Sequence, residues 1–568
     1  MTKMSGAQAL LESLERQKVD TIFGILGGAI LPVYDALCGN TKIRHILARH
    51  EQCAAHEAEG YARASGRVGV CMATSGPGAT NLVTGIANAY MDSSPIVAIT
   101  GQVPSTGLNT SYMIGRDAFQ EADIIGIVTA VTKYSYQPRN ITEIPSMVNN
   151  AFHLASTGRP GPVLIDLPKN LQSGQTKVEF TNKINLRGYK LITEPKPSKI
   201  SQAAELLAKA ETPLILAGGG VICSNASDEL IAMSDLLMAP VATTFMGKGA
   251  FPETHPLSLG SIGMHGNPAA NRLMSETDVL LAVGTRFSDR ATANLDTFAP
   301  NAKKIHIEID NAEINKNIEV NVPILADAKI TLNKLHSAVK EKLQKGEGTA
   351  WIKRVKEAKE QLSPLLKELP KDIVPKNLLT ALREMLPENG IITTEVGQNQ
   401  MWSALYFKAL NPRTFISSGG LGTMGFGFPA AIGAKVACPD RPVIDIAGDG
   451  SFIMSEQELA CSVQENIPVI AIILNNSVLG MVAQWQRMLY NRRYNAVNLG
   501  NTPDFVKLAE AYGAQGFRAN SMEEFQKAVK TALTSKVTTV IDVPIGSETD
   551  VVPFVPPGCG LPQQRGDY

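Results

Sequence analysis

Gly448-Asp449-Gly450-Ser451 is a short polar turn between two apolar runs, residues 442–447 before it and residues 469–474 after it. Residues 454–464, which separate the turn from the second run, have a helical pattern. A strand, a turn, a helix and a second strand in this order form a βαβ unit. The stretch therefore predicts an open parallel sheet with ligand-binding turns.

A polar side chain follows each of these two predicted strands. Asp449 comes after the first strand and Asn476 after the second. Because the carboxyl ends of parallel strands share one edge of a sheet, we expect the two side chains to meet there. Mg²⁺ prefers such oxygen ligands and commonly bridges one or two of them to a diphosphate. Gly448 and Gly450 would let backbone N–H groups approach phosphate oxygens at the start of the helix.

The same alternation of short apolar strands and helices fills most of the 568 residues. A chain of this length is typical of about three domains, and the alternation predicts α/β domains with parallel sheets covered on both faces. The expected units are residues 1–175, 195–340 and 372–546, followed by an irregular tail at 547–568. Buried strands are expected at residues 21–26, 68–73, 95–100, 163–167, 213–217, 279–283 and 304–309.

The connections between these units have a different composition. Residues after 171 are polar up to Pro195-Lys196-Pro197 and predict a linker. Residues 340–371 are dense in Lys and Glu and predict a solvated helix with a connector. We see no short-period repeat, although the first and third units could share one fold type.

Composition excludes several classes of function. Lys+Arg and Asp+Glu both total 53, so the formal net charge is zero, and neither a nucleic-acid surface nor a basic membrane patch is indicated. Seven cysteines are dispersed, which argues against a disulfide framework. The first residues lead into an amphipathic helical pattern, and no uncharged apolar run has transmembrane length. We expect a soluble cytoplasmic protein.

Several motifs together resemble one enzyme family. A Gly-Asp-Gly alone is most often a turn, but with the paired Asn475-Asn476 it resembles the metal–diphosphate signature of thiamine-diphosphate enzymes. Arg49-His50-Glu51-Gln52 matches that family at all four positions, and residues 74–81 are similar to its acetolactate-synthase branch. Arg286-Phe287-Ser288-Asp289-Arg290 resembles the biosynthetic, flavin-binding acetohydroxyacid (acetolactate) synthases. The resemblance covers nearly the whole chain.

The resemblance implies a pyrimidine-binding first unit and a diphosphate-binding third unit, with thiamine diphosphate and Mg²⁺ as cofactors. Glu51 would hydrogen-bond the aminopyrimidine ring and promote deprotonation of the reacting carbon, whereas Glu57 is expected to be a solvated carboxylate. Asp449, Asn476 and the carbonyl of Val478 would bind the metal. Met424 would be a wedge between the cofactor rings, although methionine is often only a gap filler. The other implied thiamine contacts are Gly76, Gly397, Gln398, Asn399, Gly422, Gly448, Gly450, Ser451, Gly480 and Met481.

The resemblance also implies a Rossmann-like central unit that binds FAD as a structural cofactor. The residue triplet 218–220 follows a predicted strand, but it lacks the full spaced dinucleotide fingerprint and is weak alone. The implied flavin contacts are Arg159, Gly218, Gly219, Gly220, His265, Gly284, Arg286, Glu308, Asp310 and Asp327.

Substrate contacts are implied on all three units. Arg290 would hold the second 2-ketoacid, because a guanidinium grips a carboxylate in bidentate fashion. Trp485 would wall the pocket of that substrate, and Lys169 would line the entrance unless it is only a surface lysine. Gly28, Phe119 and Gln120 would lie near the reacting carbon.

The implied reaction joins two 2-ketoacids. Pyruvate would lose CO₂, and its two-carbon unit would be joined to pyruvate or to 2-ketobutyrate, as in valine, leucine and isoleucine biosynthesis. The site would be shared across a homodimer or homotetramer, with Glu51 from the partner chain, and a small regulatory subunit is an open possibility. Alternatives are a thiamine- and flavin-dependent pyruvate oxidase and a catalytically dead regulatory homologue.

The sequence departs from the family pattern at a few positions. Leu26 replaces the usual proline, Asn399 stands where histidine is usual, and Ser288 replaces a common aspartate. An amide at position 399 can still donate to phosphate. Residues 105–112 make the segment before Gly115 longer than usual.

Overall fold

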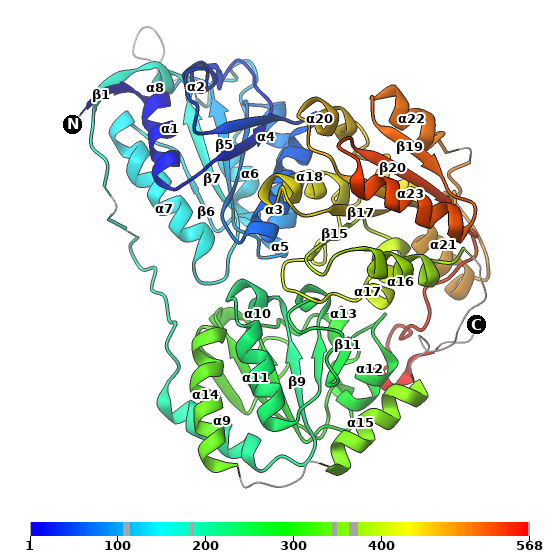
Figure 1. Cartoon of the computed structure of the whole chain (residues 1–568). Coiled ribbons are helices and arrows are strands. Elements are labelled where there is room, and N and C mark those ends of the chain that lie inside the picture. The colour runs from blue at the N-terminus through cyan, green and yellow to red at the C-terminus, as the bar shows by residue number, and fades with distance from the viewer. Residues whose placement is uncertain are drawn as a thin grey trace.

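The computed structural model describes residues 2–105, 114–181, 183–184, 186–343, 349–362, 373–500 and 502–565. It has three α/β units, each built on a six-stranded parallel sheet, so the predicted fold class is confirmed. In Figure 1 the first unit (blue to cyan) and the third (yellow to red) lie side by side above the central unit (green). Of the long segment before Gly115, only Ser105 falls within the described residues.

The first unit has the strand order β3-β2-β4-β5-β7-β6. Its strands are β2 Thr21–Gly24, β3 Arg44–Leu47, β4 Gly69–Ala73, β5 Ile96–Gln102, β6 Tyr134–Tyr136 and β7 Val163–Pro168. Its helices are α1 Gly6–Arg16, α2 Leu31–Leu37, α3 Glu51–Ser65, α4 Pro77–Asn81, α5 Val83–Met91, α6 Ile124–Val128, α7 Ile144–Ser156 and α8 Lys169–Ser173. β1 (Thr2–Ser5) pairs antiparallel with β8 (Gln175–Val178). The linker predicted after residue 171 therefore begins too early, because β8 still belongs to the first unit.

The third unit has the order β16-β15-β17-β18-β20-β19. Counted along the chain within each unit, the first and third sheets both read 2-1-3-4-6-5, so they share one fold type. The strands are β15 Ile391–Thr394, β16 Phe415–Ser417, β17 Val443–Gly448, β18 Ile470–Asn475, β19 Gln515–Arg518 and β20 Thr539–Pro544. The helices are α16 Pro375–Met385, α17 Gln398–Tyr406, α18 Gly427–Ala437, α19 Asp449–Phe452, α20 Glu458–Gln464, α21 Gly480–Leu489, α22 Phe505–Ala511 and α23 Met522–Thr534.

The helix predicted over residues 454–464 was wrong at its start. The N–H groups of Met454, Ser455 and Glu458 each bond to the carbonyl three residues earlier, so this part of the chain is a series of turns. The α-helix begins only at Glu458.

The central unit has the order β11-β10-β9-β12-β13-β14, which reads 3-2-1-4-5-6 along the chain. This is the doubly wound order of dinucleotide-binding folds. The strands are β9 Pro213–Ala217, β10 Val241–Thr243, β11 Ser258–Ser261, β12 Val279–Val283, β13 Lys303–Glu308 and β14 Val322–Leu325. The helices are α9 Pro197–Ala208, α10 Gly219–Cys223, α11 Ser227–Leu237, α12 Pro268–Met274, α13 Asp289–Thr292, α14 Ala328–Lys342 and α15 Thr349–Leu362.

The expectation of a solvated helix over residues 340–371 is wrong for the part that the structure describes. α15 buries Trp351, Val355 and Ala358 against the central unit. The Trp351 indole N–H donates to the carbonyl of Pro213 at 3.0 Å. Lys353, Lys356 and Glu360 of α15 are exposed, and such charged residues concealed this apolar stripe in the sequence.

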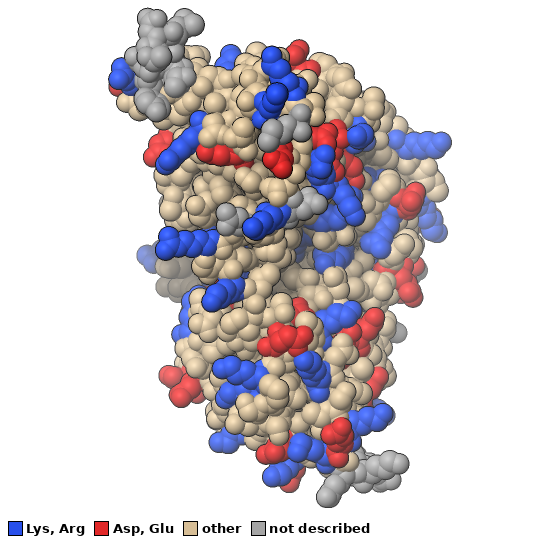
Figure 2. All heavy atoms as spheres, turned by 90° about the vertical axis from the view of Figure 1, so that its left-hand side faces the viewer, with Lys and Arg blue, Asp and Glu red and all other residues tan. Residues whose placement is uncertain are grey.

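The surface agrees with the balanced charge. On the face shown in Figure 2, basic and acidic side chains are interspersed over the whole height of the molecule. Among the helices of the described residues, none is both long enough and apolar enough to cross a membrane.

The first and third units are joined through α3 and α18, which lie against each other near the centre of Figure 1. A Cβ on Gly433 would lie 1.8 Å from the carbonyl oxygen of Glu57, and one on Gly60 would lie 2.1 Å from that of Ala430. Only glycines allow the two backbones this approach. The crossing also covers Glu57, whose exposed fraction is 0%. The prediction of a solvated Glu57 was wrong, because the helix face that it occupies packs against the third unit.

Gly433→Ala should destabilise the protein, because its methyl group overlaps the backbone of α3. Overpacking of this kind costs about 1–3 kcal/mol. The free energy of unfolding in urea would measure the loss. Gly39→Ala is the control, since a Cβ there meets nothing within 4 Å. Equal stability of the two variants would contradict the described crossing.

Candidate functional site

The carboxyl ends of β15, β17 and β18 surround a small cavity in the third unit. β15 and β17 are neighbours, and the chain continues outward from them in opposite directions along the sheet. Ligands of open α/β sheets bind at this kind of switch point. The cavity holds ≈ 90 Å³ and is lined by residues 396–399, 402, 424, 448–451, 474, 476 and 478–482. The structure thus brings most of the predicted thiamine contacts of the third unit together.

Asp449 and Asn476 both line this cavity. Asp449 is 1% exposed, and its Oδ2 has no hydrogen-bond partner among the described residues. Burial raises the pKa of Asp449 to about 6, and nearby backbone N–H groups, including that of Asn476, oppose the rise. The Oδ1 of Asn476 accepts the N–H of Val478 at 3.3 Å. A buried carboxylate oxygen without a partner, next to an amide oxygen, fits a hard cation such as Mg²⁺.

Other polar side chains at the cavity hold the strand ends together. Both N–H bonds of the Asn399 amide go to backbone carbonyls, of Glu395 and of Ile446, each at 2.9 Å. A phosphate contact from this amide, as the sequence suggested, would require one of these bonds to break. Gln398 accepts from Asn476 at 3.1 Å and donates to Gln484 at 3.0 Å. Gln398 therefore orients the proposed metal ligand Asn476.

A buried acidic pair lies beneath this cavity, and the sequence analysis did not identify it. Glu395 accepts hydrogen bonds from the hydroxyl of Ser451 and from the N–H of Gly425 and Phe428. Burial raises the pKa of Glu395 to about 6, and burial together with the charge of Glu395 raises the pKa of Asp445 well above its usual range. Ser451 is thus committed to Glu395. In the sequence, the only sign of this pair is that both residues lie close to the motifs at 397–399 and 448–451.

The loop that carries Met424 and Gly422 is held by the first unit. The hydroxyl of Ser418 accepts the N–H groups of Gly422 and Thr423 and itself donates to Asn88 of α5. Met424 reaches the cavity from this loop. Its position at the cavity mouth is compatible with the wedge role.

A second group of predicted residues lies at the carboxyl edge of the first sheet. Glu51 is the first residue of α3, and its Oε2 accepts from the Asn81 side chain at 2.9 Å. A Cβ on Gly78 would lie 3.4 Å from the other oxygen of Glu51, and one on Gly76 would lie 2.8 Å from the carbonyl oxygen of Gln120. Gly76 and Gly78 therefore allow this loop to pack beside the carboxylate and residue 120.

Three further predicted residues follow strands of the same sheet. Gly28 follows β2, Phe119 follows β5 and Lys169 begins α8 directly after β7. A Cβ on Gly28 would meet nothing within 4 Å, and Phe119 is 88% exposed. The edge is therefore open at Gly28 and exposes an apolar ring at Phe119. Exposed apolar side chains of this kind are typical of binding surfaces.

The two groups do not form one site within a single chain. Among the described residues, the third-unit cavity is lined only by positions 396–482. Neither Glu51 nor Phe119 reaches it. The chain therefore presents two separate groups of predicted site residues, the proposed half-sites.

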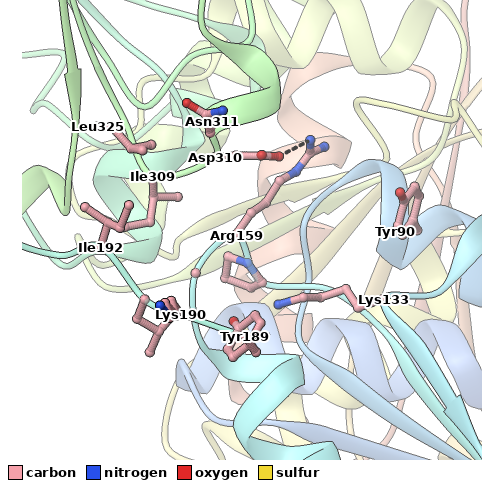
Figure 3. Close-up of a pocket in the computed structure, with 13 residues that line it drawn as sticks. Tyr90, Lys133, Arg159, Tyr189, Lys190, Ile192, Ile309, Asp310, Asn311 and Leu325 are labelled. Carbon is pink, nitrogen blue, oxygen red and sulfur yellow. Dashed lines mark hydrogen bonds and ion pairs between the residues drawn. The ribbon is translucent and has the colours of Figure 1, made fainter. Parts of the chain in front are cut away.

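A larger cavity, of ≈ 330 Å³, lies between the first and central units. Figure 3 shows Arg159 reaching from the first unit to Asp310 of the central unit. Lys133 and Tyr189 lie on the side of Arg159 that is away from Asp310. Arg159 also donates to Glu313 at 2.8 Å and to Ser93 at 2.9 Å. Two of the predicted flavin residues, Arg159 and Asp310, thus line this cavity.

Arg286 and Glu308 belong to the same charged region. Burial lowers the pKa of Arg286, and the charge of Arg159 adds to this effect. Burial raises the pKa of Glu308 to about 7. Two neighbouring, poorly hydrated arginines fit an anionic group such as the diphosphate of FAD.

The remaining predicted flavin residues have structural contacts of their own. Gly218 and Gly220 pack against the backbone of Gly284, where added Cβ atoms would approach to 2.1 and 2.6 Å. Asp327 is the N-cap of α14, and its other oxygen accepts from the hydroxyl of Ser224 at 2.7 Å. Close packing explains the glycines at 218 and 220, and helix capping explains the aspartate at 327. No bound ligand is needed to explain these residue types.

Phe554, in the tail at residues 547–568, lies between Trp485 and His265, and His265 lies near Arg290. The sequence analysis did not assign the tail to the site. The ring centroid of Phe554 lies 6.2 Å from the ring centroid of Trp485 and 6.2 Å from that of His265. Burial lowers the pKa of His265 to about 4, and the nearby charge of Arg290 contributes. His265, which the resemblance placed at the flavin, thus lies with the proposed substrate residues. The side chain of Arg290 is 68% exposed.

Comparison with known proteins agrees with this arrangement. Three family models match: "Thiamine pyrophosphate enzyme, N-terminal TPP binding domain" at residues 4–127, the central domain at 200–335 and the C-terminal TPP binding domain at 395–543. A probable acetolactate synthase large subunit of Methanocaldococcus jannaschii is 51% identical over 98% of this chain and 94% of that protein. The acetolactate synthase large subunits of Corynebacterium glutamicum and Buchnera aphidicola are 45% and 43% identical, over 98% and 100% of this chain and 89% and 99% of theirs.

Asp449→Asn should stabilise the cofactor-free protein at pH 7.5 by about 1–3 kcal/mol, because one oxygen of the ionised carboxylate is buried without a hydrogen-bond partner among the described residues. The pKa of Asp449 is raised on folding to about 6, so the carboxyl stabilises the fold only when protonated. Its contribution is present below the unfolded pKa of about 4 and is lost as the pH rises through 6.

Urea unfolding of both proteins between pH 4 and pH 8 measures this difference, which should vanish near pH 4. Calorimetric titration with Mg²⁺ and thiamine diphosphate should show the opposite ranking, with weak binding by the variant. A variant that binds both as the wild type does would remove Asp449 from the metal site.

Proposed function

The chain belongs to the acetolactate synthase large-subunit family of thiamine pyrophosphate enzymes, and on that premise we propose that it removes CO₂ from pyruvate and joins the two-carbon unit to a second 2-ketoacid. The products would be 2-acetolactate from pyruvate and 2-aceto-2-hydroxybutyrate from 2-ketobutyrate. The observation that carries this proposal is the unpartnered carboxylate oxygen of Asp449 beside Asn476 at two adjacent strand ends.

Mg²⁺ would be held by Asp449, Asn476 and the carbonyl of Val478, and it would fix the diphosphate against the N–H groups that begin α19. Thiamine diphosphate supplies, when bound, a carbon that accepts the electron pair released with CO₂. Gln398 accepts from the Nδ2 of Asn476 and so fixes the orientation of the amide whose oxygen would bind the cation. Met424 would support the cofactor rings from the loop that Ser418 orders.

Glu51 would hold the proton that passes to and from the aminopyrimidine ring. Its carboxylate is oriented by one donor, the amide of Asn81. A Cβ on Gly78 would lie 3.4 Å from the second oxygen and 2.8 Å from the Thr74 side chain, so glycine keeps this side of the carboxylate uncrowded. A positioned carboxylate of this kind contributes about 10²–10⁴-fold as a general acid or base.

Arg290 would bind the carboxylate of the second 2-ketoacid, and Trp485 would fill the space around its alkyl group. Phe554 packs against Trp485 and against His265, and the charge of Arg290 acts on His265. A wall of aromatic side chains can distinguish a methyl from an ethyl group by about 10–200-fold.

The two half-sites support a homodimer in which Glu51 of each chain serves the thiamine held by its partner. Large apolar side chains are exposed near both half-sites: Leu26 and Phe119 in the first unit, and Leu421, Met454 and Val482 in the third. Patches of this kind mark interfaces. Because the relatives are named large subunits, we also propose that a small regulatory partner binds.

FAD would occupy the cavity between the first and central units, with Arg159 and Arg286 at its diphosphate. The proposed reaction is not a net oxidation, so the flavin would stabilise the domain contact. All seven cysteines are unpaired, which supports a location in the cytoplasm.

Glu51→Gln should lower kcat by at least about 10²-fold while leaving the affinity for thiamine diphosphate nearly unchanged. The amide keeps the shape of the side chain but cannot exchange the proton. Acetolactate formation and cofactor titration measure the two effects. Glu12→Gln, at an exposed carboxylate of the same unit, is the control. Full activity of the Glu51 variant would refute its proposed role.

Trp485→Leu should shift the products towards 2-acetolactate when pyruvate and 2-ketobutyrate compete, because the ethyl group loses its wall. The ratio of the two products measures the change. Leu489→Ala, at an exposed position on the same helix, should leave the ratio as it is. An unchanged ratio in the Trp485 variant would place the pocket elsewhere.

A further inference from the structure

The segment that leads into Glu51 is held by a carboxylate of the third unit. Glu458, the first residue of α20, accepts the backbone N–H of Arg49 at 2.9 Å and that of His50 at 3.1 Å. Glu458 is 0% exposed. These two amide groups immediately precede Glu51 in the chain. A displacement of either would therefore move the start of α3.

The other end of α20 binds the same segment. Glu465 directly follows the last residue of the helix. Its side chain accepts the N–H of Leu47 at 3.4 Å and pairs with Arg44 at 3.3 Å. Arg49 also donates to the side chain of Gln464. α20 thus holds residues 44–50 at both of its ends.

We propose that Glu458 is a positioning residue for Glu51, and that a neutral Glu57 completes the arrangement by donating its proton to Glu458. The proposal rests on the proposed role of Glu51. It concerns residues of one chain only and does not depend on the partner subunit.

The geometry around Glu57 supports a shared proton. One oxygen each of Glu57 and Glu458 and the Sγ of Cys461 lie within 4.8 Å of one another. Glu57 Oε2 has no partner among the described donors and acceptors, and the thiol of Cys461 donates to Oε1 at 3.6 Å. Two buried carboxylates this close cannot both be ionised. Glu458 already accepts two N–H groups as a carboxylate would, so the proton belongs to Glu57.

The buried environment favours the same assignment. Burial raises the pKa of Glu57 well above its usual range, and the charge of Glu458 raises it further. Burial also raises the pKa of Glu458 to about 7, but the N–H of Arg49 opposes the rise. The three side chains could alternatively bind a metal ion, which the test below distinguishes.

Glu458→Gln keeps one accepting oxygen but removes the negative charge from the acceptor of the two N–H groups. In the cofactor-free protein, deuterium exchange of peptides covering residues 46–52 should become about tenfold faster, because the hydrogen bonds from Arg49 and His50 lose their charged acceptor and become weaker. In the loaded enzyme kcat should fall about tenfold or more with KM little changed, since small misplacements of a catalytic group are costly. Glu456→Gln, two residues earlier and without a partner for its Oε2, is the matched control and should show neither change.

Glu57 provides the second arm of the test. Glu57→Gln keeps a neutral donor and should retain slow exchange at 46–52, whereas Glu57→Ala should accelerate it as Glu458→Gln does. Unchanged exchange in both Glu458→Gln and Glu57→Ala would overturn the proposal. Stoichiometric metal in the purified wild type that is lost in Glu57→Gln would also overturn it. Because exchange is measured without cofactor, failure of the Glu51 assignment would appear separately, as activity retained in Glu51→Gln.

Discussion

The backbones of α3 and α18 touch where each helix has a glycine, and the rest of the molecule is arranged around this contact. α3 begins with Glu51, and α18 begins directly after the loop that carries Met424. One buried cluster of apolar side chains runs through both units on either side of the crossing. The main-chain contact therefore sets how α3 packs against the third unit, while the Glu458 side chain holds the segment that leads into Glu51.

Buried carboxyl groups are concentrated beside this crossing. Asp449, Glu395, Asp445, Glu57 and Glu458 are each at most 1% exposed, and the pKa of every one of them is raised, first of all by burial. Interiors seldom tolerate such groups without a purpose. Two purposes can be distinguished here. Asp449 has one oxygen without a partner in the described part of the chain, which could bind a ligand. Glu395 and Glu458 instead accept backbone N–H groups, Glu395 from the segment after Met424 and Glu458 from the segment before Glu51.

The sequence predicted the sheets well and the surroundings of the site less well. Strands β9 and β12 occur at the predicted residues, because parallel strands buried on both faces are continuous apolar runs between turns. Asp449 and Asn476 could be paired since strand order places their ends together. Glu57 and α15 were misjudged for one reason: charged residues on a helix do not reveal which face another unit covers. Phe554 could not be found, because a lone aromatic residue in an irregular segment has no periodicity to interpret.

Residues 551–565 cross from the third unit to the central one, where the N–H of Val555 donates to the carbonyl of Met264 at 2.8 Å. In Figure 1 this red segment runs down beside α12. This segment follows the strands of all three sheets in the chain, and it carries Phe554, the aromatic neighbour of Trp485. A product truncated shortly before Phe554 would retain every strand of the three folds. It would lose Val555 and Leu561, which are buried in a core cluster of the central unit, together with the ring that packs against Trp485.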